Sequence, residues 1–178
     1  MHNPEVMDPP YIVRTERLTL RHLDFDDAPF IIELLNQPSF LRYIGDKKVR
    51  NVADAHRYLQ TGPLASYEKY GYGLYWVGDR ETGMPVGICG LIKRDSLEDA
   101  DIGFAFLPEH CGKGYAPESG RAVLEHGKQA FGLERVVAIV QPDNQASIRV
   151  LGKLGFRYEK MISLDEKPVT LQYFSVAL

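Results

Sequence analysis

A glycine-rich stretch, residues 108–118 (PEHCGKGYAPE), combines features that favour anion binding. Gly112 and Gly114 lack the Cβ atoms that would hold a ligand away from the backbone. An apolar run, 102–107, precedes the stretch and an amphipathic run, 116–131, follows it, which predicts a strand, a tight turn and a helix. Backbone N–H groups and the helix dipole converge at such a turn, so we expect it to bind a phosphate-like anion.

Two common phosphate-binding motifs do not fit this stretch. A P-loop begins with glycine and ends with Gly-Lys-Ser/Thr, but Leu107 holds the first position here and Gly114 the last. The dinucleotide-binding fingerprint needs a third glycine where Pro117 stands. Glycine turns also precede many helices that bind nothing, so the stretch alone does not identify a ligand.

Residues 110–116 (HCGKGYA) resemble the pyrophosphate loop of the GNAT acyltransferases, Gln/Arg-x-x-Gly-x-Gly/Ala, with Gly114 and Ala116 in its last two fixed positions. Cys111 stands where the family usually has Gln or Arg, a tolerable change because the loop binds through main-chain N–H groups. The resemblance implies acetyl-CoA as co-substrate and no metal. The cofactor-binding residues that it implies are Phe106, Leu107, Cys111, Gly112, Lys113, Gly114, Tyr115, Ala116 and Asn144.

The segment 15–21 (TERLTLR) alternates polar and apolar residues, with Leu18 and Leu20 on one face, which predicts a half-buried strand. The same pattern, Thr-Glu-Arg-Leu-x-Leu-Arg, is similar to the opening of the RimJ/RimL-type branch of GNAT. That branch acetylates the N-termini of ribosomal proteins. The resemblance therefore implies an amine acceptor, either a ribosomal-protein N-terminus or a small-molecule amine.

The segment 144–156 (NQASIRVLGKLGF) is similar to the Asn-x-x-Ser/Ala…Lys-x-Gly-Phe segment of the same family. Asn144 and Gly155 are also ordinary helix-capping residues, so a well-capped helix explains them equally well. Many family members carry a tyrosine that protonates the leaving thiolate, but Leu151 occupies that place. Ser147 matches the serine assigned this role in RimL-like members, and it is the catalytic residue that the resemblance implies.

Acetyl transfer to an amine needs a neutral amine, and therefore a base or a water chain. The sequence offers Asp101, Glu109 and His110 without selecting one, with Glu98 and Asp99 on the preceding turn. A backbone N–H near residues 106–107 is expected to meet the developing oxyanion. A covalent acetyl carrier at residue 111 is disfavoured because no His–Asp pairing accompanies the thiol.

These residues must be positioned by a mixed sheet. The expected elements are a strand over 15–21, helices over 28–35 and from 51 or 54 to a break near 62–63, strands over 71–77, 84–92 and 101–107, a helix over 116–131, a strand over 135–140, a helix over 144–154, and strands over 156–163 and 168–176. This order resembles the GNAT acyl-CoA N-acyltransferase fold. It is an α/β fold with a mostly antiparallel sheet of about seven strands, about four flanking helices and a parallel pair at the acetyl-CoA site. We expect residues 1–13 to form a lead-in and 14–178 to form one GNAT domain.

Composition narrows the class of protein further. The chain has 178 residues and a net charge of −3, which suits one domain and gives no electrostatic footprint for nucleic acid or a membrane surface. No apolar run approaches a membrane span, and the first residues lack a signal-peptide pattern. Two cysteines form neither a disulfide framework nor a metal motif. We expect a cytoplasmic protein, either a monomer or a homodimer.

The sequence as a whole predicts an acetyl-CoA-dependent N-acetyltransferase that moves acetyl directly to a primary amine. A catalytically silent CoA-binding sensor and a partner-binding module of the same fold are the alternatives. Aromatic residues that either line the acceptor groove or belong to an ordinary core are Phe40, Tyr43, Tyr70, Tyr72, Tyr75 and Trp76.

Overall fold

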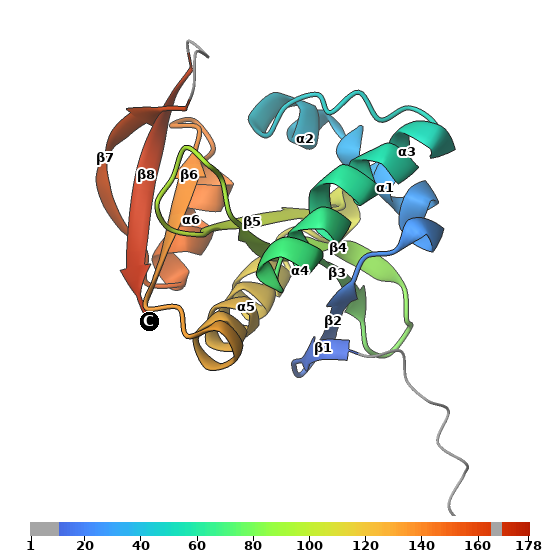
Figure 1. Ribbon diagram of the computed structural model, residues 1–178, viewed down its shortest axis with the longest axis horizontal. Coiled ribbons are helices and arrows are strands. Elements are labelled where there is room, and N and C mark those ends of the chain that lie inside the picture. The colour runs from blue at the N-terminus through green and yellow to red at the C-terminus, as the bar shows by residue number, and fades with distance from the viewer. Residues whose placement is uncertain (1–10, 165–168) are drawn as a thin grey trace, which may run out of the picture.

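The computed structural model describes residues 11–164 and 169–178 (Figure 1). The strands are β1 (Tyr11–Arg14), β2 (Leu18–His22), β3 (Leu74–Asp79), β4 (Pro85–Ile92), β5 (Asp101–Phe106), β6 (Arg135–Val140), β7 (Arg157–Ser163) and β8 (Thr170–Ala177). The α-helices are α1 (Ala28–Leu35), α2 (Pro38–Tyr43), α3 (Val52–Leu59), α4 (Ala65–Tyr70), α5 (Tyr115–Phe131) and α6 (Gln145–Lys153). Short 3-10 turns lie at Phe25–Asp27 and Pro108–His110, and a π-helical segment lies at Gln60–Leu64. Within the described ranges, no helix has both the length and the apolar character of a membrane span.

The strands form one eight-stranded sheet in the order β1-β2-β3-β4-β5-β6-β8-β7. Every neighbouring pair is antiparallel except β5 and β6. These two strands meet in register only where Asp101 lies opposite Val137, whereas β4 pairs with β5 along its whole length. In Figure 1, β5 runs across the picture while β6 runs steeply past its end. The carboxyl-terminal part of β5 therefore has a strand partner on one side only, and we call the unpaired interval between it and β6 the gap.

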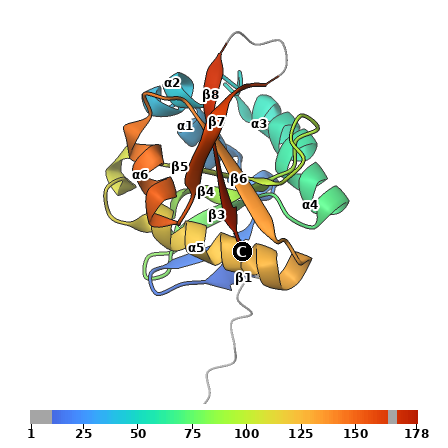
Figure 2. The same cartoon turned by 90° about the vertical axis from the view of Figure 1, so that its left-hand side faces the viewer.

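Helices cover both faces of this sheet. One core cluster joins the sheet to α5 and α6 through residues such as Leu124 and Leu151. A second cluster joins the opposite face to α1 and α3 through residues such as Ile31 and Leu59. In both views, α1, α2 and α3 lie above the central strands β3 and β4, and α5 lies below these strands (Figures 1 and 2). The predicted mixed, mostly antiparallel α/β sheet with one parallel pair is confirmed.

Several local features differ from the expectation. Residues 11–14 pair with β2 as an eighth strand, so ordered structure includes the last part of the expected lead-in. Residues 38–43, which fall between the predicted elements, form the short helix α2, because Pro38 begins it with its fixed φ. The predicted helix break near residues 62–63 falls in the π-helical segment Gln60–Leu64, which interrupts the regular α-helical bonding between α3 and α4. The chain stays helical there as a π turn, whose wider bonding tolerates Pro63.

The remaining boundaries lie close to the prediction. The expected strand over 71–77 begins later, at Leu74, because Gly71 ends α4 with φ +86°. The start of the last predicted strand, Pro168, lies outside the described residues, and β8 is seen from Thr170 onward. Asn144 and Gly155 bound α6 as capping residues, the second with φ +87°.

Candidate functional site

The glycine-rich turn joins the carboxyl end of β5 to the start of α5. Gly112 has φ +76° and Gly114 has φ +84°, a left-handed conformation that side chains rarely adopt. Among the described residues, a Cβ atom built on Gly112 would meet nothing within 4 Å, so the space beside this glycine is open. Within the part of the chain that the structure describes, no side chain caps α5, which leaves the first-turn N–H groups of Tyr115 and Ala116 for a ligand. The turn therefore has the geometry of an anion site.

The gap between β5 and β6 opens beside this turn. Leu107 donates its N–H to the carbonyl of Val86 at 2.9 Å, so that group is used within the sheet. Successive residues of a strand direct their N–H groups to opposite sides, which turns those of Phe104 and Phe106 toward the gap. Of the two positions predicted to meet an oxyanion, Phe106 is thus the one whose N–H faces the gap.

The start of α6 forms the other side of the gap. Asn144 ends the turn after β6 and accepts a hydrogen bond from the N–H of Ser147 at 3.3 Å, which confirms its capping role. Ser147 is half-buried one turn into the helix. Leu151, at the position of the family tyrosine, is 2% exposed and packs in the core. The parallel pair thus places residues 111–116 and residues 144–147 at the same edge of the sheet.

A polar clasp joins α2 to the end of β6 beside the gap. The side-chain amide of Gln141 donates to the carbonyl oxygens of Arg42, at 3.3 Å, and Tyr43, at 3.2 Å. The Arg42 guanidinium pairs with Asp143 at 3.2 Å. Sequence reasoning missed these contacts, since nothing in a local pattern links residues about a hundred positions apart. The clasp brings the first helices to the open edge of the sheet.

The candidate bases fall in two different places. Asp101 lies at the amino end of β5, roughly 17 Å of strand away from the glycine turn. It is 2% exposed and bonds the Nε of Arg94 at 3.0 Å. Burial raises the pKa of Asp101 to about 6, although Arg94 opposes the shift. Asp101 is therefore a buried ion-pair residue at the start of β5. Glu109 and His110 lie in the single turn before the glycines.

Cys111 lies in the turn with its sulfur 3.5 Å from the carbonyl oxygen of Leu107. Burial, followed by the charge of Glu109, raises the pKa of the Cys111 thiol. A raised pKa keeps the sulfur protonated at neutral pH, and a thiol is a much weaker nucleophile than a thiolate. This environment favours direct transfer over a covalent acetyl carrier.

Most of the aromatic residues considered for the acceptor groove belong to the two cores. Tyr72 and Tyr75 pack on the α5 face of the sheet, and Phe40 and Trp76 pack on the α1 face. These four residues are at most 7% exposed. The ordinary-core interpretation holds for them, and Tyr43 is the half-buried aromatic that lies in the clasp.

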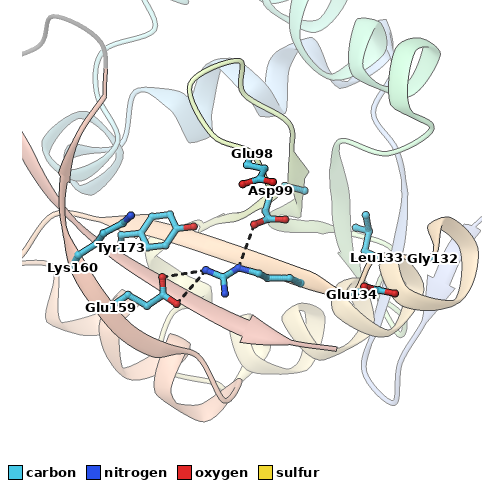
Figure 3. Close-up of a pocket in the computed structure, with 10 residues that line it drawn as sticks. Glu98, Asp99, Gly132, Leu133, Glu134, Glu159, Lys160 and Tyr173 are labelled. Atoms are coloured by element: carbon cyan, nitrogen blue, oxygen red, sulfur yellow. Dashed lines mark hydrogen bonds and ion pairs between the residues drawn. The ribbon is translucent and has the colours of Figure 1, made fainter.

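A pocket of about 670 Å³ opens at the opposite end of the parallel pair (Figure 3). Its centre is Arg135, which pairs with Asp99 at 3.2 Å and with Glu159 at 3.1 Å. Glu98 also lines it. Because this pocket surrounds the amino ends of β5 and β6, the acidic residues of the preceding turn do not reach the glycine turn.

An open helix start behind two left-handed glycines, beside a splayed parallel pair, is an arrangement suited to binding an anion. Comparison with known proteins identifies the class of protein. Residues 17–157 match the model of an acetyltransferase (GNAT) domain. The chain belongs to the GNAT family, and it is an acetyltransferase.

Two relatives come from Bacillus subtilis. The uncharacterized protein YkkB is 32% identical over 161 residues, covering 88% of this chain and 91% of the relative. The uncharacterized N-acetyltransferase YoaA is 33% identical over 153 residues, covering 85% of each chain.

Solved structures share the fold over almost the whole chain. A GNAT-family acetyltransferase from Bacillus anthracis is 25% identical with a TM-score of 0.76, covering 93% of this chain and 97% of that one. Spermidine N-acetyltransferase from Vibrio cholerae, solved with CoA and spermine, is 18% identical with a TM-score of 0.75, covering 92% and 96%. RimL, a ribosomal alpha-N-protein acetyltransferase solved with coenzyme A, is 18% identical with a TM-score of 0.73, covering 94% and 98%. The last two likenesses concern the fold alone.

Proposed function

We propose that this protein is an acetyl-CoA-dependent N-acetyltransferase of the RimJ/RimL-like branch, which transfers acetyl directly to a primary amine. The observation that carries the proposal is the uncapped start of α5 behind two left-handed glycines, at the open edge of the splayed β5–β6 pair. A diphosphate fits this turn because main-chain N–H groups can approach it where no Cβ stands in the way. The family match supplies the reaction class.

Each side of the gap has a role in this proposal. Acetyl-CoA, when bound, supplies an activated thioester. With acetyl-CoA bound, the N–H of Phe106 would polarise the acetyl carbonyl, and Asn144 would hold the pantetheine arm. Ser147 would donate a hydrogen bond to the thioester sulfur. As the C–N bond forms and the C–S bond breaks, the remaining proton of the attacking amine would be lost and the leaving thiolate would take one up, giving the amide and free CoA thiol. The amine gives up a proton before attack, to Glu109, His110 or a water chain near the turn.

The acceptor is the amine of a ribosomal-protein N-terminus or of a small molecule such as a polyamine. Support comes from two structural relatives whose names carry these substrates, spermidine N-acetyltransferase and RimL. The polar clasp between α2 and the end of β6 lies beside the gap. We therefore place the approach of the amine between these two elements.

The test is product formation with acetyl-CoA and a panel of amines: spermidine, free amino acids, and peptides copying ribosomal-protein N-termini. Products should be detected by mass spectrometry, because the exposed Cys111 thiol would react with the usual thiol dyes. We expect one class of amine to gain a single acetyl group. Tight CoA binding without any product across the panel would instead support the silent sensor, and absence of both would contradict the proposal.

A further inference from the structure

Arg17 lies between β1 and β2 and reaches the glycine turn from outside. Its Nε bonds Oε1 of Glu118 at 2.7 Å, and its backbone N–H bonds Oε2 of the same carboxylate at 3.0 Å. The hydroxyl of Thr15 also donates to Glu118, at 2.5 Å. Glu118 therefore anchors this N-terminal turn on α5. We call Thr15, Arg17 and Glu118 the loop clasp.

The loop clasp also holds the glycine turn in place. Nη1 of Arg17 donates to the carbonyl oxygen of Lys113 at 2.8 Å. Its guanidinium lies 4.6 Å from the ring centroid of Tyr115, the first residue of α5. A Cβ atom on Gly114 would stand 3.3 Å from Nη2 of Arg17. Arg17 thus contacts the turn on the side where the glycine leaves room for it.

These contacts determine which way one peptide group points. The carbonyl of Lys113 and the N–H of Gly114 belong to the same planar trans peptide, so they point in opposite directions. When Arg17 holds the carbonyl on its own side, the N–H of Gly114 is turned to the far side, away from the guanidinium. A free glycine-rich peptide would rotate readily, since glycine permits many conformations.

The charges of Arg17 and Glu118 within the loop clasp also balance. A carboxylate one turn into α5 would by itself repel an anion bound at the helix start. Burial opposes ionisation of Glu118, but bonds from Thr15 and Arg17 outweigh it and lower its pKa, so Glu118 is ionised at neutral pH. The guanidinium of Arg17 neutralises that charge beside the site. Glu118 therefore anchors the N-terminal turn without leaving a net negative charge near the anion.

We propose that Arg17 is a positioning residue for the diphosphate of acetyl-CoA, acting through the Lys113–Gly114 peptide that it holds in place. This inference rests on the proposed function of the turn. It assigns to the Thr-Glu-Arg motif a task beyond starting a strand. Arg17 touches neither the acetyl group nor the amine, so its effect should be confined to cofactor affinity.

The test compares Arg17→Ala with a matched control, Arg21→Ala. Arg21 lies in β2, four residues after Arg17. It pairs with Asp27 at 2.9 Å, and its guanidinium lies 4.1 Å from the ring centroid of Trp76, so it is engaged away from the glycine turn. Calorimetric titration with CoA should show a roughly tenfold to hundredfold weaker Kd for Arg17→Ala, the loss of one oriented bond to a charged group. Arg21→Ala should bind CoA like the unaltered protein even where its Tm falls.

Kinetics separate positioning from general damage. For Arg17→Ala the KM for acetyl-CoA should rise with the Kd, while kcat at saturation and the KM for the amine stay unchanged. S-acetylpantetheine, which lacks the diphosphate, should react equally well with Arg17→Ala and with the unaltered protein. Arg17→Lys keeps the positive charge but lacks the planar guanidinium with its several N–H donors, so it should recover part of the affinity for CoA.

Equal CoA affinity in Arg17→Ala and the unaltered protein, or an equal loss in Arg21→Ala, would overturn this inference alone. An unaltered protein that binds neither CoA nor acetyl-CoA would overturn the proposed function and this inference with it.

Discussion

Replacing Asp101 with asparagine should make the stability of the protein less dependent on pH. The carboxylate is 2% exposed and has Arg94, whose side chain is 38% exposed, as its ion-pair partner. Burial raises its pKa from 3.8 to about 6 in the folded protein. A carboxyl group whose pKa is higher in the folded state takes up a proton on folding. Its favourable contribution is therefore present at low pH and is lost as the pH rises from about 4 through about 6.

The size of the effect follows from that shift. A difference of roughly two pKa units corresponds to about 3 kcal/mol between the fully protonated and fully ionised limits. Between pH 4.5 and pH 7.5 the linkage relation gives about 2 kcal/mol of this total. The neutral amide of Asp101→Asn has no such dependence. The stability of the variant minus that of the unaltered protein should thus rise by about 2 kcal/mol over this range.

Urea unfolding of both proteins at several pH values measures this difference in the free energy of unfolding. The contributions of the other titrating groups cancel because both proteins share them. Glu118→Gln is the control with the opposite sign, because the pKa of Glu118 is lowered in the folded state and its contribution is lost as the pH falls. A pH-independent difference for Asp101→Asn would refute the assignment of Asp101 as a buried carboxylate with a raised pKa. The same variant should keep its transfer rate, whereas a loss of about a hundredfold or more would restore Asp101 as the base.

Further predictions concern single side chains near the site and the core. Gly112→Ala should lose about 1–2 kcal/mol in urea unfolding, because φ +76° disfavours a Cβ even where nothing contacts it. Leu151→Tyr should lose about 1–3 kcal/mol in the same assay by overpacking the core, and its transfer rate should not rise. Cys111→Ser should keep its transfer rate, and a total loss would revive the covalent carrier. Burial lowers the pKa of His126 below its usual 6.5, so the stability of the protein should fall as the pH drops through about 6.5. Thermal melts at pH 7.5 and 5.5 should show a smaller fall in Tm for His126→Gln than for the unaltered protein.

Local patterns made much of this fold predictable. The alternation around Leu18 and Leu20, the apolar run 135–140 and the glycine turn each depend on residues close together in the chain. The family resemblance rested on the same local segments. The structure agrees with these elements because their periodicity fits the burial that the sheet imposes.

The rest depends on contacts between distant segments. Arg17 meets Glu118 and Arg42 meets Asp143 about a hundred residues away, and no local pattern marks either pair. The burial of Asp101 likewise follows from its place in the sheet rather than from its neighbours in the sequence. Sequence reasoning therefore located the turn, while the side chains that hold it in place required the structure.

The most direct test of the central claim is thermal unfolding with acetyl-CoA, free CoA, ATP and NAD⁺ in separate samples, for the unaltered protein and for Gly114→Glu. A ligand at a hundred times its Kd adds about 2.7 kcal/mol of stability. For a chain of this size that is a Tm rise of roughly 5–11 °C. We expect this rise with both CoA species and not with ATP or NAD⁺, and we expect it to vanish in Gly114→Glu, which places a Cβ and a negative charge at the turn. An unaltered protein whose Tm does not move with millimolar CoA or acetyl-CoA would contradict the account.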